Sequence, residues 1–435
     1  MSFKNISIVT FGCKMNQAES QAMGEKFLEL GFNVSYNKDL IEPEEGTVII
    51  NSCTVTSEAE RKIKQYIRKV KRSYPAIKII VVGCGAYTMP QAFTEAGADL
   101  VLGNHEKKHI QNYITEHGIR ADIDYWKKED DPILVPKESY EGRTRVFFPV
   151  QEGCLNSCTY CRIVFARGRK IKSIEKNEVI KIISGYIEKG FKEIVLTGIN
   201  LSYYGFDNDE NLEELISLIE KKFCSKSVRI RLTSLYPDSV TGGIIDVLTT
   251  SSIFEHHIHY SLQHISEDIL KKMGRRYTAS ELFRQAELLR SRDPYFCLTS
   301  DIIVGFPGET ETDIYRLSEG IKNLDMLKVH VFRFSPRPQT LAASFSDQVL
   351  GKDKAERMRF IEKTACQSRE KYLQKFVGIV SDVLVEKDTV AGKTGFGYDQ
   401  YYVPHHISIS GKHENEFLRV RSISFDDKGV KSIVL

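Results

Sequence analysis

Three cysteines lie close together near the middle of the chain, at Cys154, Cys158 and Cys161, with glycine and small polar residues between them. Their C-x3-C-x2-C spacing differs from the C-x2-C-x2-C run of bacterial ferredoxins, in which a distant cysteine completes the coordination. Three thiolates can hold three irons of a [4Fe-4S] cluster and leave the fourth iron open to a small ligand. An iron with a free coordination site can bind a reactant, which indicates a catalytic cluster rather than one that only stores electrons. The alternative is three ligands of a zinc site, although zinc loops usually carry paired C-x2-C units.

The first 120 residues alternate short strand patterns with amphipathic helical patterns. The predicted strands lie at residues 6–11, 47–51 and 77–82, and the predicted helices lie at residues 19–30 and 57–71. Such alternation is typical of a doubly wound parallel sheet. We therefore expect an α/β domain at the start of the chain.

A cysteine follows each of these three predicted strands, at Cys13, Cys53 and Cys84. Ligands of open α/β sheets gather outside the carboxyl ends of the strands, so three thiols that are distant in sequence are expected at one edge. Glycines beside these cysteines leave room there for a bulky group. A single cysteine after a strand is usually a small buried hydrophobic residue. Three in the same position predict a second, auxiliary iron-sulfur cluster.

A strand followed by a helix repeats six times between about residues 145 and 340. The predicted strands are residues 145–150, 193–197, 228–233, 257–262, 298–304 and 329–334. Six units predict a (β/α)6 partial barrel that is open on one side. Active sites of such barrels lie at the C-terminal ends of the strands, and the loop with Cys154 follows the first of them. An open barrel suits a macromolecular substrate.

The last part of the chain reads as all-β. Residues 371–435 alternate apolar and polar side chains between turn signals, which predicts a small barrel of the oligonucleotide-binding type. A long charged helix at residues 352–374 precedes it, and a charged, proline-containing linker is expected at residues 126–144. The chain then divides into an N-terminal domain at 1–125, a central domain at 145–370 and the C-terminal barrel.

Composition excludes several classes of protein. The 435 residues are 41% hydrophobic and 27% charged, which is ordinary for globular protein. The sequence holds no apolar run of the ~18 residues that span a bilayer and no signal-peptide core at its start. Nine cysteines without an export signal are expected to be reduced thiols or metal ligands. We expect a cytoplasmic protein with no membrane partner.

The net charge of +3 does not by itself indicate nucleic-acid binding, but two segments are locally basic. Residues 61–72 are one of them, and a solvated helix face is the favoured explanation of this segment. Residues 162–172 directly follow the central cysteine loop and contain no acidic residue. This position favours a functional role for the second segment.

With these motifs in view, the sequence resembles the radical S-adenosylmethionine (SAM) methylthiotransferases over essentially its whole length. Residues 10–20 (TFGCKMNQAES), 51–56 (NSCTVT) and 83–84 match the N-terminal domain of that family. The loop at residues 154–161 resembles the loop whose cluster leaves one iron free to chelate SAM. The C-terminal barrel resembles the TRAM domain, which binds RNA.

The resemblance implies two [4Fe-4S] clusters and SAM as cofactors. In the family, an electron delivered to one cluster cleaves SAM to methionine and a 5′-deoxyadenosyl radical. A second SAM methylates a sulfur at the auxiliary cluster, and the methylthio group then replaces the hydrogen on the adenine carbon between the two pyrimidine nitrogens. The expected ligands are Cys154, Cys158 and Cys161 for the SAM cluster, and Cys13, Cys53 and Cys84 for the auxiliary cluster.

The resemblance also implies contacts outside the clusters, and no catalytic side chain is assigned beyond the cluster ligands. The expected SAM contacts are Asn200, Gln263, Gly305, Gly308 and Glu309. The expected RNA contacts lie in the second basic segment, at Arg167, Arg169, Lys170 and Lys172.

Two segments resemble one branch of the family. Residues 195–205 (VLTGINLSYYG) and 229–235 (RIRLTSL) are closest to the branch that acts on N6-threonylcarbamoyladenosine at position 37 of tRNA. The isopentenyladenosine branch typically has Gly-Gln-Asn where this chain has Gly198-Ile199-Asn200. The expected partners are a tRNA anticodon stem-loop, a low-potential electron donor of the flavodoxin or ferredoxin type, and a sulfur source.

Three other functions stay open at this point. The substrate is alternatively isopentenyladenosine in tRNA or an aspartate of a ribosomal protein, with the same chemistry. The third alternative is a non-catalytic iron-sulfur protein that binds RNA or transfers electrons.

The chain departs from the family pattern at three places. It has Arg162-Ile163-Val164 where Ile-Ile-Pro is usual, His264-Ile265 where Ser-Gly is usual, and Gln339 in place of a glycine. All six expected ligand cysteines are present, so the clusters are still expected. The departures predict a difference at the rim that admits substrate. The remaining thiols and the histidines of one strand are expected to be ordinary structural residues: Cys224, Cys297, Cys366, His256, His257 and His259.

Overall fold

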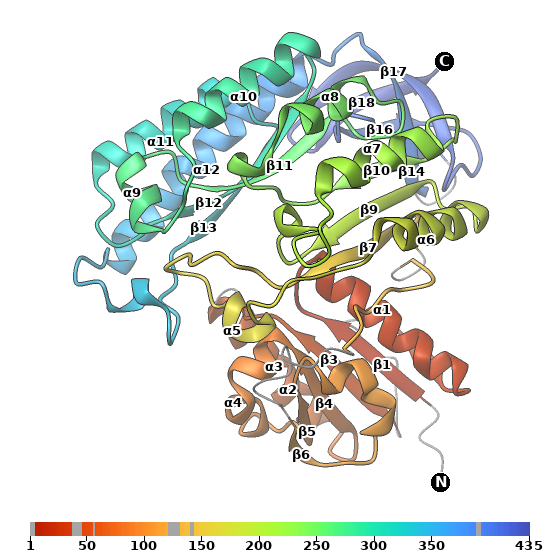
Figure 1. Cartoon of the computed structure of the whole chain (residues 1–435), viewed down its shortest axis with the longest axis vertical. Helices are drawn as coiled ribbons and strands as arrows, with labels where there is room; N and C mark the ends of the chain where they lie inside the picture. The colour runs from red at the N-terminus through yellow and green to blue at the C-terminus, as the bar shows by residue number, and fades with distance from the viewer. Residues whose placement is uncertain (1–4, 37–45, 55–56, 121–130, 140–142, 389–392) are drawn as a thin grey trace.

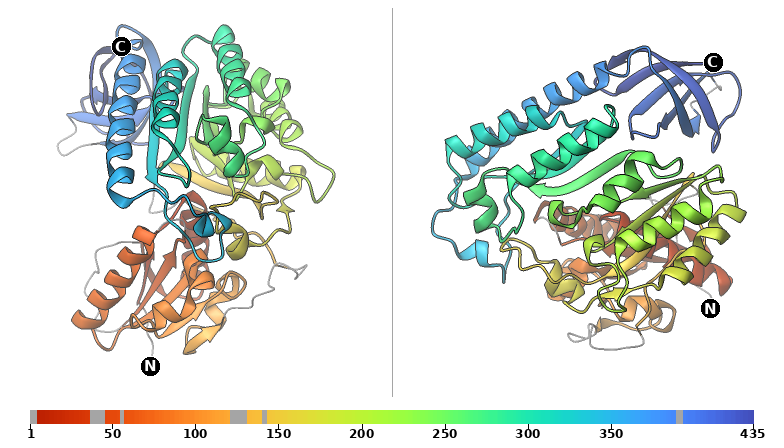
Figure 2. Two further views of the ribbon diagram at one scale, coloured as in Figure 1. Left: turned by 90° about the vertical axis from the view of Figure 1, so that its left-hand side faces the viewer. Right: turned by 45° about the horizontal axis from the view of Figure 1, so that its top comes forward.

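The chain folds into three bodies that follow one another along the sequence (Figure 1). They are an N-terminal α/β sheet, a central partial barrel and a small C-terminal β-barrel. The N-terminal sheet and the small barrel lie at different ends of the central body, as the two further views in Figure 2 also show. The computed structural model describes residues 5–36, 46–54, 57–120, 131–139, 143–388 and 393–435.

The N-terminal body is a six-stranded parallel sheet in the order β2-β1-β3-β4-β5-β6. Its strands are β1 (Asn5–Thr10), β2 (Asn33–Ser35), β3 (Thr47–Ser52), β4 (Lys78–Gly83), β5 (Leu100–Leu102) and β6 (Gly118–Arg120). Its helices are α1 (Lys14–Glu29), α2 (Ser57–Ser73), α3 (Cys84–Thr88), α4 (Pro90–Thr94) and the 3-10 helix η1 (Glu106–Asn112). Apolar clusters cover both faces of the sheet, which explains why β3 and β4 read as continuous hydrophobic runs.

The central body contains all six predicted strands, and they form two adjoining sheets. The strands are β7 (Arg145–Glu152), β9 (Glu193–Gly198), β10 (Arg229–Leu232), β11 (His257–Gln263), β12 (Cys297–Val304) and β13 (Lys328–Arg333). Single parallel bridges join the sheet that ends in β10 to the sheet that begins with β11. The other edges, β13 and the short antiparallel strand β8 (Lys172–Ser173), belong to different sheets. This arrangement confirms a partial barrel that is open on one side.

Helices pack outside this barrel and alternate with its strands. They are α5 (Ile163–Arg167), α6 (Lys176–Glu188), α7 (Leu212–Phe223), α8 (Gly242–Thr250), α9 (Glu267–Lys272), α10 (Ala279–Arg292) and α11 (Glu311–Leu324). Three 3-10 helices lie in its loops: η4 (Leu201–Tyr203), η5 (Pro237–Ser239) and η6 (Leu341–Ser344). The side chains of β7 and β9 that face these helices belong to the largest apolar core.

Helix α1 of the N-terminal body packs on the inner face of the partial barrel. Phe147 and Val195 alternate with strand residues of the outer core, so they face inward. Both of them contact Ala18 of α1 in a separate apolar cluster. The N-terminal body therefore contributes to the interior of the barrel at strands β7 and β9.

The C-terminal body is a closed five-stranded barrel in the order β14-β15-β16-β18-β17, as the sequence predicted. Its strands are β14 (Val380–Asp388), β15 (Thr394–Tyr398), β16 (Pro404–Ser408), β17 (Phe417–Asp426) and β18 (Gly429–Val434). Helix α12 (Gly351–Gln374) runs along α11 and leads into this barrel (Figure 2). Among the described helices, none has both the length and the apolar character needed to cross a membrane.

Phe376, just after α12, joins the small barrel to the central body. Its ring centroid lies 5.5 Å from that of Tyr295 in the central body and 5.5 Å from that of Tyr401 in the small barrel. Leu327 and Val430 complete the same buried cluster.

Removing this ring is expected to loosen the small barrel. The substitution Phe376→Ala leaves a cavity between two bodies and should cost about 3–5 kcal/mol in the free energy of unfolding of that region. Hydrogen exchange should show faster exchange in β14–β18 than in the unmodified protein. Phe360→Ala on α12 is the matched control, because the Phe360 side chain is exposed. Equal exchange in the two variants would contradict this account of the interface.

Candidate functional site

The central cysteine loop leaves the C-terminal end of β7 and is fixed by backbone contacts. The amide of Cys161 donates to the carbonyl of Cys158 at 3.1 Å, and the amide of Cys154 donates to the carbonyl of Gly168 at 3.4 Å. Gly153 begins the loop with φ +84°, and a Cβ there would lie 2.1 Å from the carbonyl oxygen of Lys170. Only glycine fits this position, so the turn that presents the three thiols is specified by sequence.

The three thiols of this loop lie in an environment that favours a cationic partner. Burial and the neighbouring Cys158 raise the pKa of Cys161 to about 12. Hydrogen-bond donors face two of the sulfurs: the amide of Ile163 lies 3.4 Å from Cys161 Sγ, and Asn200 Nδ2 lies 3.6 Å from Cys154 Sγ. Three thiolates can coexist here when a metal centre offsets their charge and the donors stabilise the sulfurs.

The second set of thiols forms at one edge of the N-terminal sheet. Strands β1, β3 and β4 pair in parallel, with Ser52 opposite Gly83, so Cys53 and Cys84 leave the sheet side by side. A Cβ on Gly85 would lie 2.8 Å from the carbonyl oxygen of Cys53, which shows how closely these two segments approach. Cys13 follows β1 at the same edge. The predicted convergence of three thiols at the carboxyl ends of the strands is therefore present in the fold.

The spacing of the sulfurs argues against zinc in either set. Among the described residues, neither trio of cysteines has all three sulfurs within 4.8 Å of one another. Tetrahedral zinc, with Zn–S bonds of ~2.3 Å, needs sulfurs about 3.8 Å apart. A [4Fe-4S] cluster spreads its thiolates over different irons and so fits a wider spacing. Each set supplies three thiols, the donor type and number that suit a [4Fe-4S] cluster with one open iron.

Arg167 connects the two thiol sets, and the prediction that it contacts RNA is wrong. Its side chain is 3% exposed, and its Nε donates to Cys84 Sγ at 3.1 Å. Its two terminal nitrogens bind the carboxylate of Glu19 on α1, with Nη2 3.0 Å from Oε2. Lys107 Nζ lies 2.7 Å from the same carboxylate. The charge of Arg167 thus serves the contact between the first two bodies and is not available to a macromolecule in solution.

The other predicted RNA contacts lie nearer the surface. Arg169 is exposed and donates to the carbonyls of Leu155 and Asn156 in the cysteine loop, at 3.2 and 3.4 Å. Lys170 is also exposed. Lys172 is half-buried and donates to the carbonyl of Asp131 at 2.9 Å.

The predicted SAM contacts separate into two groups. Gln263 lines a cavity beside the cysteine loop, and Asn200 lies next to Cys154. Gly305, Gly308 and Glu309 do not line this cavity. The carboxylate of Glu309 is buried.

The protein itself surrounds that carboxylate. Glu309 Oε1 accepts from the amide of Gly305 at 2.8 Å and from Arg357 at 2.9 Å, and Oε2 lies 3.5 Å from His264 Nε2. A Cβ on Gly308 would meet Lys272 Nζ and Asp347. The structure therefore gives the Glu309 side chain a structural role, and His264, a departure from the family pattern, takes part in it.

A partly buried cation beside the cysteine loop was not predicted. Arg275 donates to the hydroxyl of Tyr160, and its guanidinium carbon lies 4.4 Å from the ring centroid of Tyr236. Within the described residues, its Nε and Nη1 have no hydrogen-bond partner. Tyr236 Oη lies 4.0 Å from Cys158 Sγ. No motif marks Arg275 in the sequence, because its neighbours come from distant loops.

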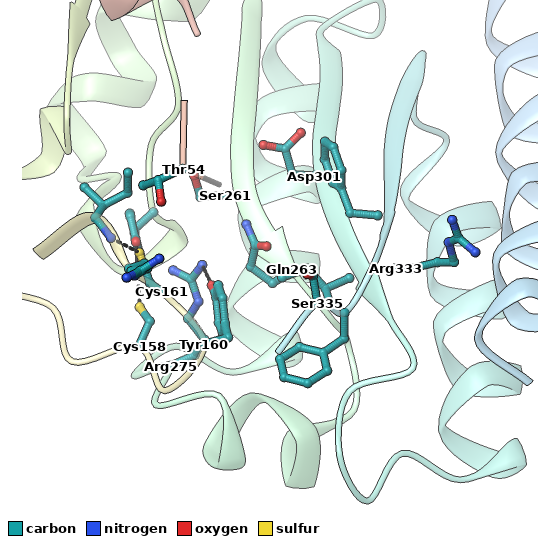
Figure 3. Close-up of a pocket in the computed structure, with 16 residues that line it drawn as sticks. Thr54, Cys158, Tyr160, Cys161, Ser261, Gln263, Arg275, Asp301, Arg333 and Ser335 are labelled. Carbon is teal, nitrogen blue, oxygen red and sulfur yellow. Dashed lines mark hydrogen bonds between the residues drawn. The ribbon is translucent and has the colours of Figure 1, made fainter. Parts of the chain in front are cut away.

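Two cavities with shared walls lie inside the partial barrel. The first has a volume of about 240 Å³ and is lined by Cys158, Cys161 and Gln263, as Figure 3 shows. The second has a volume of about 490 Å³ and is lined by Cys13. Ile163, Ser261 and Asp301 line both cavities. The two thiol sets thus face adjoining parts of one interior space, which is large enough for a small organic group.

All three bodies contribute to the second cavity. Lys14 enters it from α1, His257 and His259 enter it from β11, and Tyr402 enters it from the small barrel. The sequence predicted that these two histidines are ordinary structural residues; the structure places both in the wall of this cavity. They lie beside Thr299, at 2.8 and 2.9 Å from its hydroxyl.

Comparisons with known proteins agree with this geometry. Residues 5–103 match the family described as "Uncharacterized protein family UPF0004", and residues 148–319 match the radical SAM superfamily. A solved structure of the radical SAM methyltransferase TsrM from Kitasatospora setae superposes with a TM-score of 0.56 at 15% identity. It covers 79% of this chain and 77% of that chain, and this likeness shows the fold.

Curated relatives match over nearly the whole chain. The Thermotoga maritima protein named "Threonylcarbamoyladenosine tRNA methylthiotransferase MtaB" is 38% identical over 99% of this chain and 96% of that protein. The Bacillus subtilis protein of the same name is 33% identical over 92% of this chain and 89% of its own length. An Endomicrobium trichonymphae protein named "tRNA-2-methylthio-N(6)-dimethylallyladenosine synthase" is 31% identical over 88% of this chain and 89% of that protein. The chain therefore belongs to the radical SAM methylthiotransferase family.

Proposed function

We propose that this protein converts N6-threonylcarbamoyladenosine at position 37 of tRNA to its 2-methylthio derivative. The observation that carries the proposal is that Cys158 and Cys161 of one three-cysteine set and Cys13 of the other line adjoining cavities inside one barrel. Relatives named for this substrate cover nearly the whole chain. As a radical SAM methylthiotransferase, the protein uses SAM and [4Fe-4S] clusters.

In this proposal each thiol set has its own cluster. Cys154, Cys158 and Cys161 hold the SAM cluster, and Cys13, Cys53 and Cys84 hold the auxiliary cluster. When bound, the first cluster and SAM supply the one-electron chemistry that removes hydrogen from the adenine ring, and the second cluster supplies sulfur. Gln263 and Asn200 are proposed SAM contacts because they lie beside the first set.

The surrounding side chains position these groups and exclude water. Arg275, Tyr160 and Tyr236 form the wall beside Cys158, where a cation and two hydroxyls can orient an anionic group. Arg167 holds Cys84 by a charge-assisted hydrogen bond. Helix α1 packs on the inner face of the barrel at β7 and β9 and so fills part of the interior that water would otherwise occupy.

The proposal includes partners outside the chain. The substrate is presented by a tRNA anticodon stem-loop, and exposed Arg169 and Lys170 beside the cysteine loop suit phosphate contacts. A low-potential donor of the flavodoxin or ferredoxin type provides electrons, and a separate sulfur source restores the auxiliary cluster. We place the reaction in the cytoplasm, where these partners and tRNA are found.

Iron content tests the assignment of two clusters. Anaerobically reconstituted protein is expected to contain about eight irons per chain, and the triple variant Cys13→Ala, Cys53→Ala, Cys84→Ala about four. Replacing Cys224, Cys297 and Cys366 by alanine is the control and should leave about eight irons per chain. About eight irons in the Cys13, Cys53, Cys84 variant would contradict the auxiliary site.

The contact between Arg167 and Cys84 predicts a change in reduction potential. A cation that donates to a cluster sulfur stabilises the more negative, reduced state and raises the potential. Arg167→Gln should therefore lower the midpoint potential of the auxiliary cluster in a spectroscopically monitored titration. Arg169→Gln is the matched control, because Arg169 is exposed and bonds only to loop carbonyls in the described structure. An unchanged potential in Arg167→Gln protein with full iron content would reject the contact.

Nucleoside analysis tests the substrate. Deletion of the gene should remove the 2-methylthio form of threonylcarbamoyladenosine from bulk tRNA and leave its precursor, as measured by mass spectrometry. Levels of methylthiolated isopentenyladenosine should stay unchanged. Loss of that second nucleoside, or an unchanged profile of both, would contradict the proposed substrate.

A further inference from the structure

The second cavity contains cations without carboxylate partners. Lys14 and Lys328 line it, Lys328 from an exposed position, and among the described residues neither ammonium group forms an ion pair within 4.0 Å. Arg231 lines the same cavity. Arg231 differs, because Glu193 lies 3.0 Å and Glu255 lies 3.5 Å from its guanidinium. The uncompensated positive charge of this cavity therefore comes from the two lysines.

Asp301 offsets part of this charge, from beyond ion-pair distance. Asp301 is the one carboxylate among the lining residues, and it lies 3.3 Å from Nε2 of His259. His330 also lines the cavity, with its ring centroid 6.1 Å from that of His259. His257 is buried, and within the described residues its Nδ1 has no hydrogen-bond partner. The cavity thus offers cations and a free imidazole nitrogen to whatever occupies it.

An apolar occupant would be poorly matched to this wall. Covering two lysines and a free imidazole nitrogen with hydrocarbon removes their water and returns no hydrogen bond, which costs free energy. A carboxylate would instead form charge-assisted bonds with the ammonium groups. The lining therefore selects for an occupant that carries a negative charge.

We propose that the second cavity is the subsite for the carboxylate of the threonylcarbamoyl substituent, with Lys14 as its main cation and Lys328 as a second. This inference rests on the proposed function and deepens it. A threonyl group joined to N6 through a carbamoyl bridge keeps a free carboxylate and a hydroxyl. An isopentenyl group at the same nitrogen has neither, so the cavity separates the two kinds of modified adenosine.

The position of Lys14 relates substrate selection to the site of sulfur transfer. Lys14 directly follows Cys13, and both residues line the same cavity. The substituent leaves adenine at its Watson–Crick edge, next to the C2 atom that receives the methylthio group. Holding the carboxylate at Lys14 therefore brings C2 toward the thiol set that contains Cys13. Tyr402 of the small barrel forms another part of the same wall.

Binding of matched RNAs tests this subsite. Three anticodon stem-loops would be compared with the reconstituted full-length protein by fluorescence anisotropy. One carries threonylcarbamoyladenosine, one carries the same group with its carboxylate converted to a neutral carboxamide, and one carries unmodified adenosine. The wild type should bind the acid RNA about tenfold more tightly than the amide RNA, the size expected for a hydrogen bond to a charged group.

Substitutions of the two lysines test whether the cavity causes the preference for the acid RNA over the amide RNA. Lys14→Met or Lys328→Met should lose most of the preference for the acid RNA while keeping the wild-type affinity for the amide RNA. Two variants are used because Lys14 adjoins a cluster ligand, and iron content is measured for both. Lys352→Met, at an exposed position on α12, is the matched control and should keep the full preference.

The outcomes separate this inference from the proposed function. Equal affinities of the wild type for the acid and amide RNAs overturn the subsite, as does full retention of the preference in both cavity variants. If the wild type also methylthiolates the acid and amide RNAs equally well, the proposed function stands without the subsite. If it methylthiolates none of the RNAs, the proposed function itself is rejected.

Discussion

A buried ion pair between two bodies of the chain determines how the site is assembled. Arg167 comes from the central body, and its partner Glu19 comes from a helix of the N-terminal sheet. Lys107 approaches the same carboxylate from the other side. Removing one partner of such a buried ion pair typically costs about 3–5 kcal/mol. Because the same guanidinium also binds Cys84, the contact that joins the bodies also fixes the distance between the two thiol sets.

Much of the fold could be predicted because it depends on periodicity within single segments. All six strands of the partial barrel lie where the repeats predicted them. The strands that escaped prediction are short or atypical. Strands β2, β5 and β6 have three residues each, too few to show a period, and β16 begins with Pro404 and carries two adjacent histidines. Pairing with neighbours, rather than local preference, makes these segments strands.

The site could be predicted only in part, because several of its residues are placed by contacts between segments that are distant in the sequence. The convergence of Cys13, Cys53 and Cys84 follows from the rule that parallel strands end at one edge, so the sequence contained that information. Arg167 was misjudged because its counter-charge lies 148 residues away, and a basic run gives no sign of burial. Lys14 gains its role where separate bodies meet, and Arg275 gains its role where distant loops of the central body meet. Such residues carry no pattern in the sequence around them.

The order in which the walls of the second cavity occur along the chain has a consequence for biosynthesis. Both thiol sets lie within the first 161 residues, whereas Tyr402, in the wall of the second cavity, lies close to the carboxyl end. During translation, all six cluster cysteines therefore emerge from the ribosome well before Tyr402, which forms part of the wall of the second cavity. Iron and sulfide can therefore reach the cysteines of a nascent chain before the wall that contains Tyr402 has formed. The part of the chain that is synthesised last then adds the wall that contains Tyr402.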